Sequence, residues 1–312
     1  MRTFFAKAIF FSIAIILTVT AALFLPTDQF VRKSLFFSQI DKNNLLKTTP
    51  GPRIIFIGGS NLSFGLDGKI IKDSLNINPI NTSIHASLGL KYVIKNTSKY
   101  IRQNDIVVIA PEYHQFYGHT ADGEIELLTM IIDVSPETKS LIGFKQFLQL
   151  LKFVPKYFSS KINPLTHFMR ADTSVGIYDR LSFNRYGDAY KHWNLKREIV
   201  PPITIEGNFN KEIIDILVDF DKEIRSKNAK LFVTYPGYQG LSYKKGNAKI
   251  SRIQSELSKT NLSILGNPKR YEMPDSLIYN TPYHLTREGV VKRTILLISD
   301  IKNQLNYKLS HK

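Results

Sequence analysis

The sequence predicts an α/β fold in which helices cover both faces of a parallel sheet. Short, almost continuous apolar runs alternate with segments of helical periodicity along much of the 312 residues. Such runs, bounded by glycine, proline or asparagine, are typical of strands buried on both faces of a sheet. The alternation of strands and helices favours parallel pairing, because a parallel connection needs a crossover of about a dozen residues or more.

The predicted elements form two blocks. The first block contains strands and helices in alternation, at 53–59, 66–75, 78–86, 89–103 and 105–113. The second block continues the same order with a helix, a strand, a helix, a short strand and a last helix, at 210–228, 229–237, about 246–260, 262–266 and after 289. This order predicts a doubly wound, flavodoxin-like parallel sheet in a three-layer α/β/α arrangement.

The segment from about 115 to 205 interrupts the alternation and predicts a helical insertion. Its stretch LIGFKQFLQLLKFVPKYF, residues 141–158, places apolar side chains on one side of a helix and lysines around them. Two interpretations remain open. The helix packs on the core, or it forms a basic amphipathic surface that contacts a membrane or covers a site.

Residues 1–28 predict an N-terminal transmembrane helix. The run from Ala8 to Leu25 is uncharged over 18 residues, and as a helix it would reach about 27 Å, close to the thickness of a bilayer core. A cleaved signal peptide is the alternative, because Arg2 and Lys7 form a basic start. Residues 29–51 are polar and basic and predict a connector, which leaves 52–312 for the α/β domain with its insertion.

Composition excludes several kinds of chemistry. The chain has no cysteine, so it forms neither disulfides nor thiolate metal sites. Its net charge of +16 favours an anionic neighbour, and we expect lipid headgroups or an acidic glycan. Nucleic acid is not expected, because no helix-turn-helix, zinc or RNA-binding signature is present. Glu112 and His114 have no third ligand in sight, so we expect no metal and no organic cofactor.

Polar residues gather where the predicted strands end. Ser60 follows the first strand, Glu112 and His114 follow the third, and His284 precedes the last helix. Ligands of open parallel sheets bind beyond the carboxyl ends of the strands, so these side chains are expected on a common rim. Taken alone, a Gly-Gly-Ser turn after a strand is more often plain turn geometry, with the serine capping a helix, or a phosphate-binding nest than a nucleophile site.

Three stretches occur in the order and positions seen in SGNH (GDSL-type) hydrolases. They are GGSN at 58–61, NTSIHASLGLKY at 81–92 and YNTPYHLTREG at 279–289. The chain also resembles, more loosely, membrane-anchored envelope members of that superfamily, such as the D-alanyl transfer and alginate O-acetylation proteins. The resemblance covers roughly 53–110 and 205–305. It implies that Ser60 is the nucleophile, that the amide of Gly89 contributes to the oxyanion hole, and that His284 is the base.

The sequence departs from that family at its third block, which usually contains Gly-x-Asn with the asparagine donating to the oxyanion. Here the third strand continues into APEYHQF and has no asparagine. The expected oxyanion hole therefore consists of the amides of Ser60 and Gly89, with the side chain of Asn61 turned inward. An ionised Glu112 cannot donate a hydrogen bond.

A second departure concerns the acid that orients the histidine. Asn280 and Thr281 stand four and three residues before His284, where the relatives have an aspartate. The Asn280 oxygen can accept a hydrogen bond from Nδ1 and hold the ring, but it adds no charge. Glu112 and Asp275 are the alternative sources of that charge.

Together these features predict a membrane-anchored serine esterase or acyltransferase on the outer side of the cytoplasmic membrane. Its expected substrate is an acylated envelope glycan or a lipid-linked molecule, and a membrane acyltransferase is an expected partner. The alternative is a binding or assembly component of a polysaccharide-modification system that retains the fold with a weakened site. A phosphate-binding α/β module is a third interpretation.

Overall fold

A five-stranded parallel sheet forms the centre of the protein. The computed structural model describes residues 2–23, 32–162 and 176–310. The strand order is β2-β1-β3-β4-β6, and all four pairings are parallel. The strands are β1 (Arg53–Gly58), β2 (Asn78–Asn81), β3 (Ile106–Ala110), β4 (Lys230–Thr234) and β6 (Ile264–Leu265). The predicted α/β class, the strands and their parallel pairing are confirmed.

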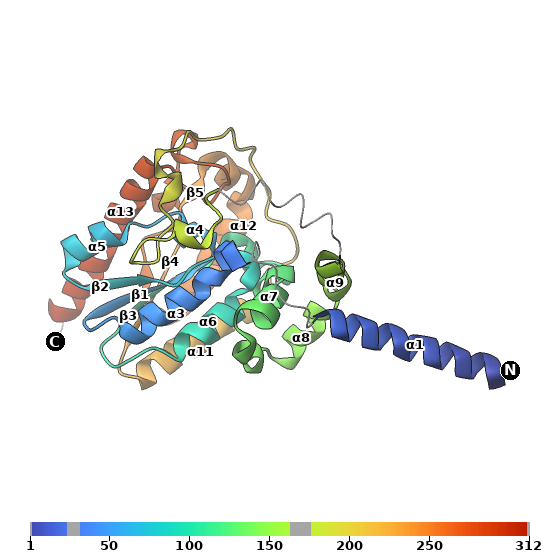
Figure 1. Ribbon diagram of the computed structural model, residues 1–312. Coiled ribbons are helices and arrows are strands. Elements are labelled where there is room, and N and C mark those ends of the chain that lie inside the picture. The colour runs from blue at the N-terminus through green and yellow to red at the C-terminus, as the bar shows by residue number, and fades with distance from the viewer. Residues whose placement is uncertain (1, 24–31, 163–175, 311–312) are drawn as a thin grey trace.

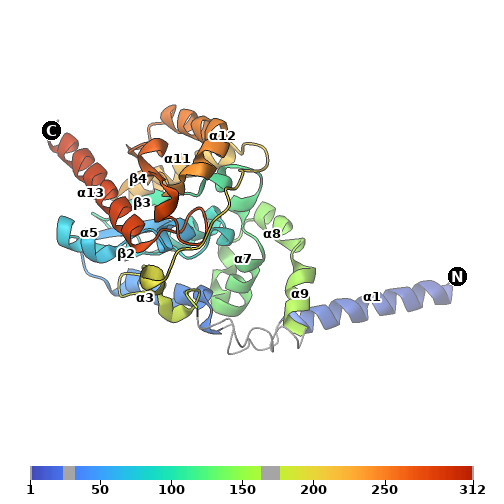
Figure 2. The same ribbon diagram turned by 90° about the horizontal axis from the view of Figure 1, so that it is seen from above.

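Helices cover both faces of the sheet (Figures 1 and 2). On one face α5 (Gly68–Leu75) contacts α13 (Arg287–Ser310). On the other face α6 (Leu90–Ser98) contacts α11 (Glu212–Ser226). The remaining elements of the second block are α12 (Gly240–Ser258) and a small parallel pair, β5 (Tyr238–Gln239) with β7 (Glu272–Met273).

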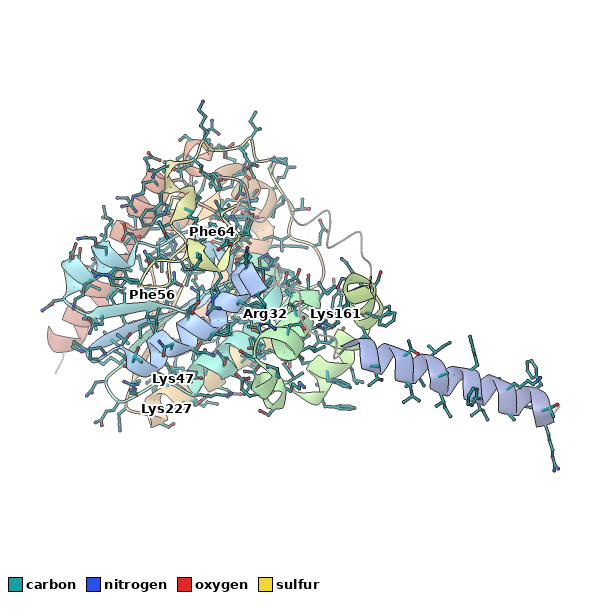
Figure 3. The ribbon with its side chains drawn as sticks, in the orientation of Figure 1. Arg32, Lys47, Phe56, Phe64, Lys161 and Lys227 are labelled. Atoms are coloured by element: carbon teal, nitrogen blue, oxygen red, sulfur yellow. The ribbon has the colours of Figure 1, made fainter. Side chains whose placement is uncertain are left out.

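The central strands are buried on both faces, which explains their continuous apolar sequences. Every residue of β1 is buried, and four of the five residues of β3 are buried as well. Phe56, in the middle of β1, is paired with Val108 of β3 and is 1% exposed (Figure 3). Because β1 and β3 are closely packed on both faces, the loops that follow their carboxyl ends begin from well-defined positions.

The predicted connector is wrong in one respect: its second half is part of the folded domain. It contains a 3-10 turn at Leu35–Phe37 and the helix α3 (Ser38–Thr48). Lys42 of α3 is fully buried, and its Nζ donates to the carbonyl oxygens of Asn81, at 2.9 Å, and Gly187, at 2.5 Å. The fold therefore begins before residue 52, because these contacts join α3 to β2 and to the insertion.

The insertion is helical, as predicted, over its first half, up to residue 162. The α-helices described there are α7 (Ile125–Thr129), α8 (Phe144–Leu151) and α9 (Val154–Ile162), with short 3-10 and π turns between them, while residues 176–205 contain two short 3-10 turns. One side of α8 is buried at Gln146 and Leu150, while Phe144 on the other side is 76% exposed. One side of α8 thus packs on the core, and the other side remains exposed. Residues 163–175 lie outside the described part.

The first helix, α1 (Arg2–Leu23), projects from the α/β body beside α9 (Figures 1 and 2). The described part of this helix ends at Leu23, whereas the apolar run in the sequence ends at Leu25. Across the described ranges, no helix has both the length and the apolar character needed to cross a membrane. The expected transmembrane helix over 1–28 is therefore not confirmed.

Candidate functional site

A hollow of about 460 Å³ lies at the carboxyl ends of β1 and β3. The strand order reverses between these two strands, and such switch points are where doubly wound sheets bind ligands. Several segments far apart in the sequence contribute its polar lining: Ser60, His85, Ser87, Glu112, His114, Tyr178, Thr281, Tyr283 and His284. The hollow brings together the four residues predicted on this rim, Ser60, Glu112, His114 and His284.

Ser60 begins the four-residue helix α4 (Ser60–Ser63) directly after β1. Its Oγ donates to Oε1 of Glu112 at 3.2 Å, and the amide of Asn61 donates to the same oxygen at 3.0 Å. The hydrogen bond that the Ser60 hydroxyl makes in this structure is therefore with Glu112 rather than with His284. Ser60 is 8% exposed, and that exposure faces the hollow it lines.

Glu112 is 2% exposed at the end of β3. Burial raises the pKa of its carboxyl group to about 7, although hydrogen bonds from Asn61 and Ser60 act in the opposite direction. Its side chain also accepts a backbone hydrogen bond in a capping box with Gln115. At neutral pH the site therefore contains a carboxyl group that is present in both protonation states.

His284 is held by two contacts in the loop before α13. Its Nδ1 lies 2.8 Å from Oδ1 of Asn280, and its ring stacks on Phe64 with centroids 4.1 Å apart and planes 16° apart. Because an amide oxygen only accepts, Nδ1 carries the proton and Nε2 is left as an acceptor. Burial lowers the pKa of His284 well below its usual value, with smaller contributions from His192 and His85. The ring is therefore neutral at neutral pH.

The insertion positions Asn280. The Nδ2 of Asn280 donates to the hydroxyl oxygen of Tyr178 at 2.9 Å, which aims Oδ1 at His284. The predicted orienting role of Asn280 agrees with this geometry. Sequence reasoning missed Tyr178, because the insertion lies outside the SGNH resemblance. It also missed Phe64, which lies four residues after Ser60, just beyond the GGSN stretch (Figure 3).

Two of the predicted oxyanion donors lie elsewhere. Gly89 is absent from the lining of the hollow, and its amide donates to the carbonyl oxygen of Ala86 at 2.9 Å. Its φ of +80° and a close approach to Gly123 explain why glycine stands there. The amide side chain of Asn61 is engaged with the amide of Gly59 and the carbonyl of Ala110. Of Asn61, only the backbone N–H reaches the site.

The remaining polar groups do not supply a charge to His284. His114 lies with Nδ1 3.7 Å from Oε2 of Glu112, and burial lowers the pKa of His114 to about 4. Asp275 begins a 3-10 turn and does not line the hollow. In the part of the chain that the structure describes, no three histidine or carboxylate side chains are placed to hold a metal ion.

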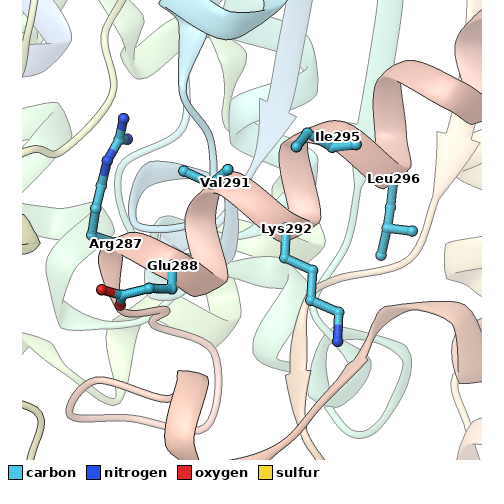
Figure 4. Close-up of a pocket in the computed structure, with 6 residues that line it drawn as sticks. All are labelled: Arg287, Glu288, Val291, Lys292, Ile295 and Leu296. Atoms are coloured by element: carbon cyan, nitrogen blue, oxygen red, sulfur yellow. The ribbon is translucent and has the colours of Figure 1, made fainter.

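A second hollow, of about 500 Å³, lies along the start of α13 (Figure 4). Its lining is mostly apolar and includes Val291, Ile295 and Leu296, with the charged side chains of Arg287, Glu288 and Lys292 at its edge. It contains neither a serine nor a histidine. The first hollow is therefore the candidate for chemistry.

Comparison with known families finds no family model that matches the chain, and no curated protein matches it. The fold and the site thus define the chain as an α/β protein with serine, glutamate and histidine at the switch point of its sheet.

Proposed function

We propose that the protein is an SGNH-like serine esterase or acyltransferase with Ser60 as its nucleophile and His284 as its base. One observation carries this proposal: Asn280 fixes the tautomer of His284 so that Nε2 is free to accept a proton, in the same hollow that Ser60 lines. A serine hydroxyl needs such a base, and the base needs a third group that orients it.

The reaction follows from these positions. The Ser60 Oγ turns from Glu112 to Nε2 of His284, transfers its proton and attacks the ester carbonyl carbon. The Asn61 amide, which donates to Oε1 of Glu112 in this structure, lies beside the nucleophile, next to the oxygen that becomes negative. When the intermediate collapses, the leaving oxygen takes the proton from His284. Water or a sugar hydroxyl then removes the acyl group from Ser60 by the same steps in reverse.

The surroundings favour an acylated molecule of the cell envelope as substrate and a membrane surface as neighbour. Phe10 of α1 and Phe144 of α8 are each 76% exposed, and the chain has a net charge of +16. Around Phe144 these apolar side chains lie among lysines, a pattern typical of helices in the interface of an anionic bilayer. Co-sedimentation of the full chain with anionic but not with neutral vesicles tests this, and equal binding to both contradicts the electrostatic contribution.

The second candidate is a binding or assembly component with a weakened site. The observation that favours it is the Ser60 hydroxyl, which is bonded to Glu112 in place of the base. The absence of an acidic residue at Asn280 has the same consequence, because the imidazolium gains no charge stabilisation.

Labelling of the full chain with a fluorophosphonate probe separates the two candidates. We expect labelling that disappears in Ser60→Ala and falls by about 10²-fold or more in His284→Ala. Ser87→Ala is the matched control, since Ser87 lines the same hollow and is expected to be irrelevant to labelling. Absence of labelling in the unmodified protein, folded by circular dichroism, would favour the binding component.

A further inference from the structure

We propose that Glu112, as a neutral carboxylic acid, donates the hydrogen bond that stabilises the oxyanion formed when Ser60 attacks its substrate. This inference rests on the proposed function. It assigns a side-chain donor to the oxyanion hole, for which the third block of the sequence has no asparagine. A carboxylic acid that stays protonated so that it can donate to an oxyanion is an established catalytic device.

The first support is the position of the carboxyl group. Oε1 of Glu112 accepts from the Ser60 Oγ at 3.2 Å and from the amide of Asn61 at 3.0 Å, so the neutral acid carries its proton on Oε2. An oxyanion generated by Ser60 forms on the carbonyl carbon that this nucleophile attacks, and stabilising donors must lie beside it. The carboxyl group therefore already borders the place where negative charge develops.

The chain is built to admit this carboxyl group. A Cβ atom on Gly59 would lie 2.5 Å from Oε1 of Glu112 and 2.8 Å from the Cβ of Ala86. Real Cβ atoms do not approach other atoms so closely, so the turn after β1 leaves room for Glu112 only because residue 59 is glycine. Gly59, which belongs to the GGSN stretch, is thus required here by its contact with Glu112.

The second support is that the other expected side-chain and loop donors are engaged elsewhere. The Gly89 amide donates to Ala86, and the Asn61 side chain bonds Gly59 and Ala110. Glu112 follows the third strand, which is where the resembling family has its donor asparagine. Among the described residues that line the hollow, no lysine or arginine offers an alternative.

The third support is that the surroundings favour the neutral carboxyl group. Glu112 is 2% exposed, and burial raises its pKa to about 7. The titratable groups that face it are the phenols of Tyr238 and Tyr283 and the imidazole of His114, with His85 and His284 across the hollow. Burial raises the pKa of both phenols and lowers the pKa of each of these three histidines, so all five are uncharged near neutral pH.

The proposed step balances as follows. The Ser60 Oγ forms a bond to the carbonyl carbon, its proton goes to Nε2 of His284, and the π electrons move to the carbonyl oxygen. The O–H of Glu112 donates a hydrogen bond to that oxygen and keeps its proton. When the carbonyl reforms, the bond to the leaving group breaks and the leaving oxygen takes the proton from His284. An ionised Glu112 would instead repel the oxyanion.

The test is the pH dependence of fluorophosphonate labelling in the full chain, from about pH 5 to pH 9, for the unmodified protein, Glu112→Gln and Glu112→Met. We expect the unmodified rate to fall up to tenfold per pH unit above a midpoint near 7. Glutamine donates at every pH, so E112Q should lack this fall. Methionine fills the space without donating, so E112M should label about 10²-fold more slowly at pH 6.

The outcomes that contradict the proposal are distinct. A rate in the unmodified protein that does not fall above pH 7 overturns the donor role and leaves the proposed function intact. Labelling of E112M as fast as the unmodified protein also overturns it, because the carboxyl group would then only obstruct the site. No labelling of any of the three proteins at any pH overturns the proposed function together with this inference.

A second measurement keeps the inference independent of activity. Infrared difference spectra between the unmodified protein and E112Q should contain a carboxylic-acid carbonyl band at pH 6 that disappears by pH 8. Its absence at pH 6 would exclude a neutral donor. Circular dichroism and thermal melts of the variants establish that each one is folded.

Discussion

The Oδ1 of Asn280 lies 2.8 Å from Nδ1 of His284, at the position from which resembling hydrolases orient their base with a carboxylate. The amide fixes the ring and its tautomer, but it contributes no negative charge. Burial meanwhile lowers the pKa of His284 well below 6.5. Asn280 thus orients His284, the proposed base, but adds no charge that would stabilise its protonated form.

Asn280→Asp should therefore accelerate labelling of Ser60. A carboxylate against Nδ1 favours the imidazolium, so it raises the pKa of His284 and strengthens the base. We expect an increase of about tenfold near pH 7, measured as the rate of fluorophosphonate labelling. Asn280→Ala is the control, and it should label more slowly because the ring loses its orientation. A rate in Asn280→Asp equal to that of the unmodified protein would show that another group orients His284.

Tyr178→Phe, a change in the insertion, should slow labelling of Ser60. The lost hydroxyl is the partner of Asn280 Nδ2 at 2.9 Å, so Asn280 becomes free to turn away from His284. A single hydrogen bond contributes about 1 kcal/mol, and we expect labelling to slow roughly fivefold. The matched control is Tyr190→Phe. Tyr190 is also in the insertion, and its exposed fraction is 41%, compared with 42% for Tyr178. Equal rates in both variants would contradict the role of Tyr178.

Gly59→Ala should abolish labelling while the fold persists. The added methyl group meets Oε1 of Glu112 at 2.5 Å and forces the carboxyl group away from Ser60. The control is Gly143→Ala, because a Cβ there meets only the end of Lys95, at 3.9 Å. Circular dichroism should show both variants folded. Normal labelling of Gly59→Ala would mean that the position of Glu112 is irrelevant to the reaction.

The sequence predicts much of this architecture because its strongest signals are local. The apolar runs of β1 and β3, and the helical periods between them, determine the sheet and the edge at which Ser60 and Glu112 meet. The predicted histidine and Asn280 are also local to one loop. These features depend on residues close together in the sequence, so their pattern is visible without the fold.

The parts that the sequence does not predict depend on long-range contacts. Lys42 belongs to a polar, basic stretch, and nothing in that stretch reveals that Asn81 and Gly187 will bury its ammonium group. The orientation of Asn280 depends on Tyr178, 102 residues away. Gly89 matches a family position, yet its amide is used within its own turn. Motif positions predict which segments converge, but not which atoms are free.

The pH dependence of stability should reveal Glu112 independently of any reaction. Its pKa is raised from 4.5 in the unfolded chain to about 7 in the fold, so the native state binds more protons. Its contribution to the free energy of unfolding is complete below pH 4.5 and is lost as the pH rises to 7. The loss is about 3 kcal/mol by linkage. Urea unfolding at pH 5 and pH 8 should show this loss in the unmodified protein and not in Glu112→Gln. Equal pH dependence in both proteins would place the titration elsewhere.

Lys42→Met should destabilise the protein strongly, because the buried ammonium group has a complete set of partners. Its Nζ donates to the carbonyls of Asn81 and Gly187 and lies 4.1 Å from the centroid of the Phe183 ring, and buried Asp188 interacts with its charge. Methionine preserves much of the apolar volume but leaves two buried carbonyls unpaired and Asp188 without its cation. Leaving two buried carbonyls without their donor costs about 1–3 kcal/mol each.

Urea unfolding followed by circular dichroism measures that loss. Lys47→Met on the exposed side of the same helix is the control and should change stability by less than about 0.5 kcal/mol (Figure 3). Because Lys42 also holds the insertion that contains Tyr178, its replacement should slow labelling of Ser60 at urea concentrations below unfolding. A loss under 1 kcal/mol would show that α3 adds little to the domain. The predicted boundary at residue 52 would then describe the stable unit better than the contacts of Lys42 do.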